Sequence, residues 1–334
     1  MILVTGAAGL VGRELVSQLI GRGEAVRGID LLPADMPDRS RFSSQPREGL
    51  DLLTADLLDP AACRKACDGV ATVVHTAARQ HHSGVPRWGR ERFFAANVEM
   101  TRNLVEASIA AGTKHFVLVS SDMVYGLPPG RPLVESDKPR PIGPYGRSKL
   151  ASEKACIAAR DRGLRVTVLR PRLIIGPGRL GILKKLFDCI RQDRRVPLLG
   201  SGRNRYQMVS VADVAEACLL AAQHPCDEIL NLGSSDPPPV RELLMSLIRR
   251  AGSRSRPLPL PRHLAHAALW CLHAVRIAPL VPEQFRIADV DYVLDTTRAG
   301  QTLGWRPRLF DPDMLFSAYC TYVDGRSRHG DSTC

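Results

Sequence analysis

The sequence predicts an α/β fold in which helices cover both faces of a parallel sheet. Short β-branched runs alternate with longer amphipathic segments through the first half of the chain, as in a series of βαβ units. A glycine-rich turn, residues 6–12, follows the first apolar run and opens the first helical segment. Right-handed crossovers join such units, so we expect a Rossmann-type, doubly wound sheet.

The apolar runs and amphipathic segments define the elements of this first half. We expect strands at Ile2–Val4, Ala25–Ile29, Leu50–Leu53, Thr72–His75, His115–Ser120 and Val166–Leu169, and helices at Arg13–Ile20, Ala61–Ala66, Val98–Ala111 and Pro144–Arg162.

Composition and charge exclude several classes of protein. The net charge of +12 comes from scattered arginines, because only seven of the 46 basic residues are lysine, so we expect no nucleic-acid partner and favour an anionic small substrate. The nine cysteines form no Cys-x-x-Cys pair and lack histidines at zinc-ligand spacing. We therefore expect no metal and reduced thiols in the cytoplasm. The chain opens on an apolar strand without a basic leader, and charged or histidine residues interrupt the apolar stretch 263–281, so no membrane span is expected.

Gly6, Gly9 and Gly12 predict a dinucleotide site because of where they lie. They stand between the first strand and the first helix, where glycine lets the backbone approach a pyrophosphate and the helix N-terminus offers free N–H groups. A purely structural strand-to-helix turn is the alternative.

Asp30 favours NAD as the cofactor. It closes the second strand, eighteen residues after Gly12, where a carboxylate can accept hydrogen bonds from the adenosine ribose and repel a 2′-phosphate. Arg27 nearby is the argument for NADP, and a turn-initiating carboxylate is the alternative reading of Asp30.

The domain organisation changes after Pro171, where proline and glycine become more frequent. We expect an NAD-binding Rossmann domain over residues 1–171 and a smaller, mostly helical substrate-binding region over 172–325. Segments around 205–232 are expected to return to the first domain, and 326–334 to form a flexible tail.

Tyr145 and Lys149 are the candidate catalytic pair. Four residues apart at the start of a helix, they emerge on one face, and an ammonium beside a phenol stabilises the phenolate that would accept a hydroxyl proton. Such pairs also occur by chance, but Ser120 and Ser121 follow an apolar strand, where open α/β sheets bind ligands. Either serine could orient the reacting oxygen, or the pair could cap the following turn.

These residues resemble the extended short-chain dehydrogenases, particularly the nucleotide-sugar epimerases and dehydratases. The resemblance covers nearly the whole chain and is more specific for fold and cofactor than for substrate. The matching motifs, in order, are Thr5-Gly6-x-x-Gly9-x-x-Gly12, Asp30, Asp56-Leu57, His75-x-Ala77-Ala78, Asn97-Val98, Ser120-Ser121-x-x-Val124-Tyr125-Gly126, Tyr145-x-x-x-Lys149, Arg170-Pro171, Gly176-Pro177, Val211-x-Asp213-Val214 and Leu303-Gly304-Trp305-x-Pro307.

The resemblance implies a role for each matched residue. Ser121, Tyr145 and Lys149 would be catalytic, with Lys149 also holding the nicotinamide ribose. Ala77 and Ala78 could instead be core residues, and Asn97 an N-cap. The implied cofactor-binding residues are Gly6, Gly9, Leu10, Val11, Gly12, Asp30, Asp56, Leu57, Ala77, Ala78, Asn97, Tyr145, Lys149 and Pro171.

Two departures from the family pattern bear on the reaction. Dehydratases of the family carry an Asp-Glu pair after the catalytic hydroxyl residue, whereas this chain has Asp122-Met123, so Asp122 remains as an acid, a substrate contact or a turn carboxylate. Epimerases have an Arg-Asp-aromatic run where this chain has Arg205-Tyr206-Gln207. Arg205 could bind a diphosphate or be a solvated loop residue, and Tyr206 could stack on a base or simply pack.

The resemblance therefore implies an NAD-dependent nucleotide-sugar epimerase or related dehydratase that oxidises a sugar hydroxyl transiently. One alternative is a secondary-alcohol dehydrogenase similar to the 3β-hydroxysteroid enzymes, with the apolar segment 264–281 lining its pocket. Another is a dinucleotide-sensing or scaffold protein without turnover, against which the retained tyrosine and lysine argue. The family resemblance also implies a homodimer.

Overall fold

A seven-stranded parallel sheet forms the centre of the protein. The computed structural model describes residues 1–31, 49–79, 89–176, 183–274 and 282–328. The doubly wound topology predicted from the sequence is confirmed. From one edge to the other the strands are β10 (Ile229–Leu232), β6 (Arg165–Pro171), β5 (His115–Val119), β4 (Thr72–His75), β1 (Ile2–Thr5), β2 (Val26–Asp30) and β3 (Leu50–Thr54).

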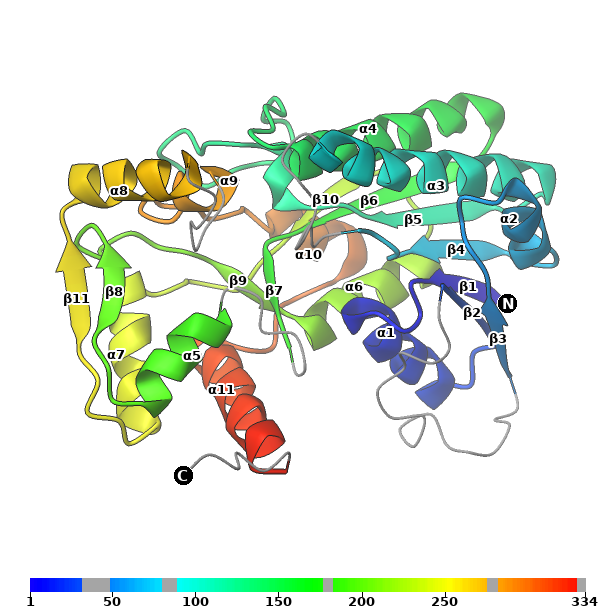
Figure 1. Ribbon diagram of the computed structural model, residues 1–334. Helices are drawn as coiled ribbons and strands as arrows, with labels where there is room; N and C mark the ends of the chain where they lie inside the picture. The colour runs from blue at the N-terminus through cyan, green and yellow to red at the C-terminus, as the bar shows by residue number, and fades with distance from the viewer. Residues whose placement is uncertain (32–48, 80–88, 177–182, 275–281, 329–334) are drawn as a thin grey trace.

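Two helical layers cover the sheet, one on each face (Figure 1). Side chains alternate along β1, so Ile2 and Val4 enter one core while Leu3 enters the other. The first core lies under α1 (Leu10–Gly21), α6 (Val211–Gln223) and α10 (Thr297–Leu303), and the second under α2 (Pro60–Cys67), α3 (Arg90–Ala110) and α4 (Pro144–Ala158), which continues into the 3-10 turn η3 (Ala159–Arg162).

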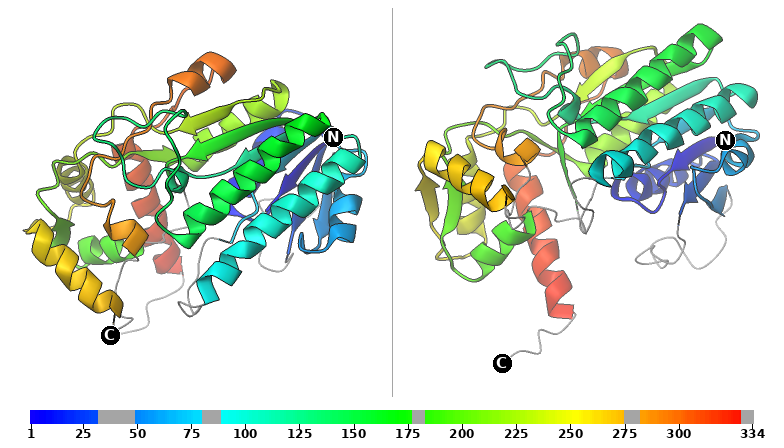
Figure 2. Two further views of the ribbon diagram at one scale, coloured as in Figure 1. Left: turned by 90° about the horizontal axis from the view of Figure 1, so that it is seen from above. Right: turned by 45° about the horizontal axis from the view of Figure 1, so that its top comes forward.

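The remaining elements form a smaller region beside the carboxyl ends of β5 and β6 (Figures 1 and 2). Its core gathers apolar residues such as Phe187, Leu247 and Tyr322. Its elements are β7 (Leu173–Ile175), α5 (Leu183–Arg191), β8 (Val196–Leu199), β9 (Met208–Ser210), α7 (Val240–Arg250), β11 (Pro257–Leu260), α8 (Arg262–Ala274), α9 (Pro282–Phe285) and α11 (Asp311–Arg328).

This region contains more β-structure than the sequence predicts. β8 pairs with β11 and β7 pairs with β9, each as a two-stranded parallel sheet. The proline-rich residues Pro257–Leu260, in the region that we expect to be mostly helical, form β11. Pro257 and Pro259 are tolerated there because an edge strand does not need every N–H for pairing.

The chain returns to the central sheet twice after Pro171. α6 packs against α1 and β10 completes the sheet beside β6. Later, Ala299 and Leu303 of α10 join the core under α1, and the indole Nε1 of Trp305 donates to the backbone oxygen of Asp213 at 2.8 Å. Residues 297–305 therefore belong spatially with the first domain, although we expect the substrate-binding region to extend over 172–325.

Some expectations fall partly or wholly outside the described residues. α11 continues to Arg328, beyond residue 326 where we expect the tail to begin, and 329–334 are not described. Pro177 and the segment 275–281 of the apolar stretch are likewise outside the described residues.

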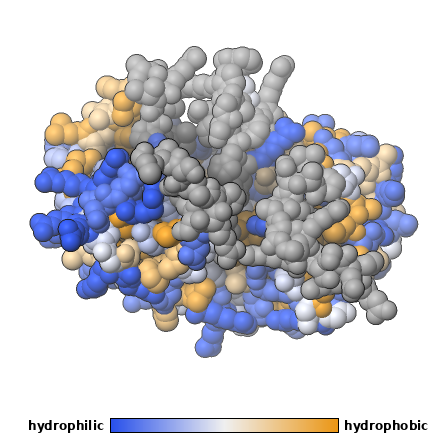
Figure 3. Space-filling view, turned by 60° about the horizontal axis from the view of Figure 1, so that its bottom comes forward, coloured by the Kyte–Doolittle hydropathy of each residue, from blue (hydrophilic) through white to orange (hydrophobic). Residues whose placement is uncertain are grey.

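Over the described ranges, no helix combines the length and the apolarity needed to cross a bilayer. In Figure 3 hydrophilic and hydrophobic residues are interspersed on both sides of the grey atoms.

Candidate active site

The glycine-rich turn is shaped by its own backbone. Gly6 has φ +67°, and its oxygen accepts a hydrogen bond from Gly9 N at 2.8 Å. A Cβ on Gly12 would lie 2.1 Å from Gly6 O, so no larger residue fits there. Gly9 caps α1 without a side chain, which leaves the first N–H groups of the helix, beginning with Leu10 and Val11, free to point at a phosphate. The cradle fits the pyrophosphate of a dinucleotide.

Asp30 lies against this turn. Its Oδ2 accepts from Ala8 N at 2.9 Å and its Oδ1 from Leu31 N at 2.7 Å, so the carboxylate sits between the glycine turn and the end of β2. Arg27 is engaged elsewhere. It donates to Asp51 at 2.7 Å and to the backbone oxygen of Asp68 at 2.8 Å, at the end of α2. Arg27 therefore gives no support to a 2′-phosphate, and the residues present fit NAD.

The segment after β4 passes directly beside the glycine turn. A Cβ on Gly6 would meet Ala77 Cα at 2.8 Å, and both Ala77 and Ala78 are half-buried. Asn97 lies inside α3, not at its N-cap. Its Oδ1 accepts from Arg79 N at 2.7 Å while its Nδ2 donates to Ser148 Oγ at 3.2 Å, and this joins the segment to the catalytic helix α4.

Asp56 and Leu57 follow β3 on the same edge of the sheet. The Asp56 carboxylate accepts from Leu58 N at 2.9 Å and so closes its own turn. Leu57 is buried in the core beneath α2 and α3, and its oxygen accepts from Asn103 Nδ2 at 3.1 Å. The structure thus places Asp56 at the turn surface and Leu57 beneath it.

Lys149 places its ammonium at the carboxyl end of β5. Nζ donates to the oxygen of Val119, the last residue of that strand, at 2.9 Å, and the side chain is buried. Burial lowers the pKa of Lys149 to about 8, against the raising effect of Glu153. Tyr145 lies one turn earlier on α4, half-buried, with its ring edge-on to Phe94 of α3 at 5.6 Å between centroids.

The two serines after β5 have different partners. Ser120 donates to Glu153, which forms a buried two-point ion pair with Arg170. Ser121 instead caps the 3-10 turn η2 (Asp122–Val124) by accepting from Met123 N at 3.2 Å, and it donates to Asp122 Oδ1 at 3.0 Å. Ser120 is thereby committed to the core, and Ser121 is the serine left at the sheet edge.

The first turn of α4 packs closely on η2. A Cβ on Gly146 would lie 2.4 Å from Met123 O, so glycine is needed between Tyr145 and the turn that carries Asp122. Pro171 ends β6, the neighbour of β5, and is buried. The structure therefore brings Ser121, Asp122, Lys149 and Pro171 to one edge, with Tyr145 on the adjoining helical turn.

Asp122 forms an ion pair that the sequence analysis missed. Its Oδ2 accepts from Arg172 Nη1 at 2.8 Å, and both side chains are buried. Burial raises the pKa of Asp122, although Arg172 and Ser121 oppose this shift. The guanidinium of Arg172 lies 4.1 Å from the ring centroids of both Tyr206 and Tyr292. Tyr206 thus packs on an arginine of the chain itself.

Arg205 lies on the surface. Its exposed guanidinium pairs with the exposed Asp236 at 3.1 Å, and its backbone N donates to Asp291 Oδ1. The structure does not place its side chain among the buried residues of the sheet edge.

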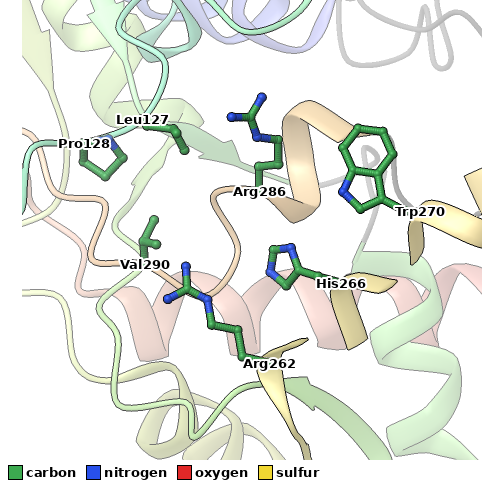
Figure 4. A pocket seen from close by; sticks show the side chains of 7 residues that line it. All are labelled: Leu127, Pro128, Arg262, His266, Trp270, Arg286 and Val290. Carbon is green, nitrogen blue, oxygen red and sulfur yellow. The ribbon is translucent and has the colours of Figure 1, made fainter. Parts of the chain in front are cut away.

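A pocket of about 310 Å³, lined by both apolar and charged side chains, lies between α8 and the 127–128 segment, and Leu127 follows Asp122 by five residues. In Figure 4 the side chains of Arg262, His266 and Trp270, on one face of α8, lie opposite the 127–128 segment. Among the described residues, the lining is Leu127, Pro128, Arg262, His266, Trp270, Arg286 and Val290.

Residues 289–292 lie between the pocket and the turn that carries Asp122. Val290 is two residues before Tyr292, whose hydroxyl donates to Asp122 O at 3.0 Å. Asp289 accepts from Arg262 Nε at 2.6 Å and His266 Nε2 at 3.2 Å, and so orients two lining residues. The spacing of Arg262, His266 and Trp270 places them on one helical face, but in the sequence His266 indicates only that the apolar stretch is interrupted, and no pocket is predicted there. In the described part of the chain, no cluster of three or more His, Cys, Asp or Glu side chains could hold a metal.

The fold and this edge define a class of protein: a nicotinamide-dependent enzyme of the extended short-chain dehydrogenase type. Comparison with known proteins agrees, since the model of the NAD dependent epimerase/dehydratase family matches residues 2–233. The chain belongs to that family and uses NAD.

Three similar proteins illustrate the range of this family. The uncharacterized protein y4nG of Sinorhizobium fredii is 34% identical over 330 residues, which cover 98% of this chain and 80% of y4nG. A 3 beta-hydroxysteroid dehydrogenase/Delta 5-->4-isomerase of Mycobacterium tuberculosis is 32% identical over 232 residues, 67% of this chain and 60% of that enzyme. MoeE5, solved in complex with UDP-glucose and NAD, superposes with a TM-score of 0.75 at 27% identity and covers 97% of this chain and 99% of its own.

Asp30 should discriminate between the two nicotinamide cofactors. We expect NADP to bind about 100-fold more weakly than NAD, because a 2′-phosphate would face a carboxylate. Asp30→Asn should narrow this ratio in calorimetric titrations, while Arg27→Met should leave it unchanged. Equal affinities in the unaltered protein would contradict the role of Asp30.

The buried ammonium should give the folded protein a distinctive pH dependence. Because the pKa of Lys149 falls to about 8, the unfolded chain binds more protons than the folded chain between about pH 8 and 10.4, and stability rises with pH there. Over pH 7.5–9.5 this contributes about 2 kcal/mol to the free energy of unfolding. Urea unfolding of cofactor-free protein should show that Lys149→Met loses this contribution, whereas Lys154→Met, exposed on the same helix, keeps it. Identical pH profiles for both variants would refute the shift.

Proposed function

We propose that the protein is an NAD-dependent nucleotide-sugar epimerase, or a related dehydratase, which oxidises a sugar hydroxyl transiently to a keto group. The observation that carries this proposal is the pocket lined by Arg262, His266, Trp270 and Arg286, opposite the segment that follows the Ser121–Val124 turn. Guanidinium groups bind phosphate oxygens through paired hydrogen bonds, and an indole offers a stacking face for a base. The solved neighbour MoeE5 binds UDP-glucose and NAD.

The catalytic residues divide the work of moving one proton. Tyr145 accepts the proton of the sugar hydroxyl, and Lys149, held by Val119 O, stabilises the phenolate that does so. Ser121 lies against the reacting oxygen, and its own proton must turn from Asp122 Oδ1 to that oxygen as the proton of the sugar hydroxyl passes to Tyr145. Bound NAD supplies the hydride acceptor, and the glycine turn, Asp30 and the segment beside Ala77 would hold it.

The substrate-binding assignments rest on the same edge. Ser121 and Asp122 would line the sugar end, and Arg286 with Arg262 would hold the diphosphate. Arg205 remains a candidate for the nucleotide end, although its pair with Asp236 must open before it can contact a phosphate.

Epimerisation is favoured over dehydration by the surroundings of Asp122. Elimination of water needs an acid and a base, and Met123 cannot take up a proton. Both Asp122 oxygens are already engaged, one by Ser121 and the other by Arg172. Epimerisation, in which the hydride returns to the opposite face of the keto group, requires neither the acid nor the base that elimination needs.

A secondary-alcohol dehydrogenase is the second candidate, favoured by the 32% identity to the hydroxysteroid enzyme. That match spans 232 residues, or 67% of this chain, so it leaves a third of the chain uncompared. The non-catalytic alternative is overturned by the enzyme family to which the chain belongs. By family resemblance we also propose a homodimer that acts in the cytoplasm on a small-molecule substrate, which light scattering and cell fractionation would test.

Product analysis over a panel of UDP- and dTDP-sugars tests the function. We expect NMR and mass spectrometry to show an isomer of unchanged mass, with no accumulation of NADH. Tyr145→Phe should bind NAD normally but lower kcat by about 10²–10⁴-fold, because the proton acceptor is lost. Loss of 18 mass units would indicate dehydration. Stoichiometric NADH, or a Tyr145→Phe variant of normal activity, would refute the proposal.

Arg286 should affect substrate binding more than chemistry. Arg286→Met is expected to raise KM for the nucleotide sugar about 10- to 100-fold with kcat nearly unchanged, since a charge-assisted hydrogen bond contributes about 1.5–3 kcal/mol. Arg249→Met, on the exposed face of α7, serves as the control for a lost surface charge. A pocket with another ligand would leave KM unaltered in both variants.

A further inference from the structure

Arg172 is held in one orientation at the carboxyl edge of the sheet. It follows Pro171 directly, and its backbone N donates to Leu232 O at 2.8 Å. Its guanidinium lies between the rings of Tyr206 and Tyr292, 4.1 Å from each centroid, and the side chain is only 2% exposed. Contact with two aromatic rings and burial restrict the rotation of the planar group, so its donors have defined directions.

These fixed donors determine where Asp122 lies. Arg172 Nη1 donates to Asp122 Oδ2 at 2.8 Å, and the Tyr292 hydroxyl donates to the backbone oxygen of Asp122 at 3.0 Å. The other carboxylate oxygen, Oδ1, accepts the hydroxyl of Ser121 at 3.0 Å. An unbroken chain of hydrogen bonds therefore runs from a clamped guanidinium to the serine at the sheet edge.

We infer that Arg172 is a positioning residue that fixes the Ser121 hydroxyl through Asp122. The inference rests on the proposed function in one respect, namely that Ser121 contacts the reacting oxygen. Asp122 and Met123 N together hold the Ser121 oxygen in one place before substrate binds, so that only the hydroxyl proton has to turn, and this lowers the entropic cost of reaching the reactive geometry. Asp122 acts here as the link between the two, and not as the proton donor of an elimination.

The neighbouring ion pair shows why this assignment is specific to Arg172. Arg170, two residues earlier on β6, pairs with Glu153, which accepts the hydroxyl of Ser120. Ser120 is a core residue, so that pair orients a hydroxyl within the protein interior. Among the described residues, only the Arg172–Asp122 pair accepts a hydrogen bond from Ser121, the serine at the edge of the sheet.

Arg172→Lys and Arg172→Met test the inference on whichever alcohol the unaltered enzyme turns over. Arg172→Met should lower kcat about 100-fold while KM and the Kd for NAD stay within about twofold, the size expected for a misplaced catalytic group. Arg172→Lys keeps a charge and should recover about tenfold of the loss. Arg160→Met, which removes an arginine anchored to Val166 O at the other end of β6, should leave kcat unchanged.

A double-mutant comparison covers the possibility that Arg172→Met leaves Asp122 buried without a partner and fails to fold. Asp122→Asn combined with Arg172→Met removes both charges together, which a core tolerates better than one unpaired charge. If the two residues act as one unit, this double variant should fold and lose no more than about the same 100-fold in kcat. A folded double variant with the kcat of the unaltered enzyme overturns the inference, as does a loss equal to the product of two large independent effects.

Crystal structures separate this inference from the proposed function. With NAD bound, Ser121 Oγ should stay within hydrogen-bond distance of Asp122 in the unaltered enzyme and move beyond about 3.5 Å in Arg172→Lys. An unmoved Ser121 overturns the inference even if the enzyme epimerises nucleotide sugars. Failure on every nucleotide sugar refutes the proposed function, while a displaced Ser121 with lowered kcat on another secondary alcohol still supports the positioning role.

Discussion

The arrangement of side chains at the carboxyl edge of the sheet depends on one buried ammonium group, that of Lys149. Lys149 is held by the oxygen of Val119, and removing its charge from water is unfavourable unless nearby groups compensate. Glu153, one turn along α4, raises the pKa of Lys149 but does not offset the effect of burial, and its own oxygens are bound to Arg170 and Ser120. The positive charge of Lys149 at the end of β5 is therefore not neutralised by a paired carboxylate among the described residues. Tyr145 lies one turn away on α4, where this charge would stabilise its phenolate in the proposed reaction.

Two ion pairs in parallel organise the strands around it. Arg170 and Arg172 are two residues apart at the end of β6, and each holds a carboxylate that binds one of the successive residues Ser120 and Ser121. One pair ties the catalytic helix to the sheet, and the other ties the serine turn to the smaller region through Tyr292. Buried ion pairs therefore connect the end of β6, the serine turn and α4 at this edge of the sheet.

The local features of this arrangement were readable in the sequence. Alternating apolar runs give the six expected strands within a residue or two, and the glycine spacing and the Tyr145–Lys149 interval depend only on nearby residues. Arg172 was overlooked because its stacking partners, Tyr206 and Tyr292, lie 34 and 120 positions away and meet it only after folding. β11 and the pocket were not predicted for the same reason, because the residues that form each of them are far apart in the sequence. In β11 the pairing with β8 overrides the local propensity of its prolines.

The return of residues 297–305 to the central sheet has a consequence for how the protein is divided. Ala299 and Leu303 cover apolar residues under α1, and Trp305 is hydrogen-bonded to Asp213. A truncated chain that ended at Gly233, the limit of the family match, would retain all seven strands, α1 and α6, but would lose Ala299, Leu303 and Trp305 from the core on this face of the sheet. The core of the NAD-binding domain therefore includes residues that follow most of the smaller region in the sequence. We expect that neither region can be cut out of the chain as one continuous segment.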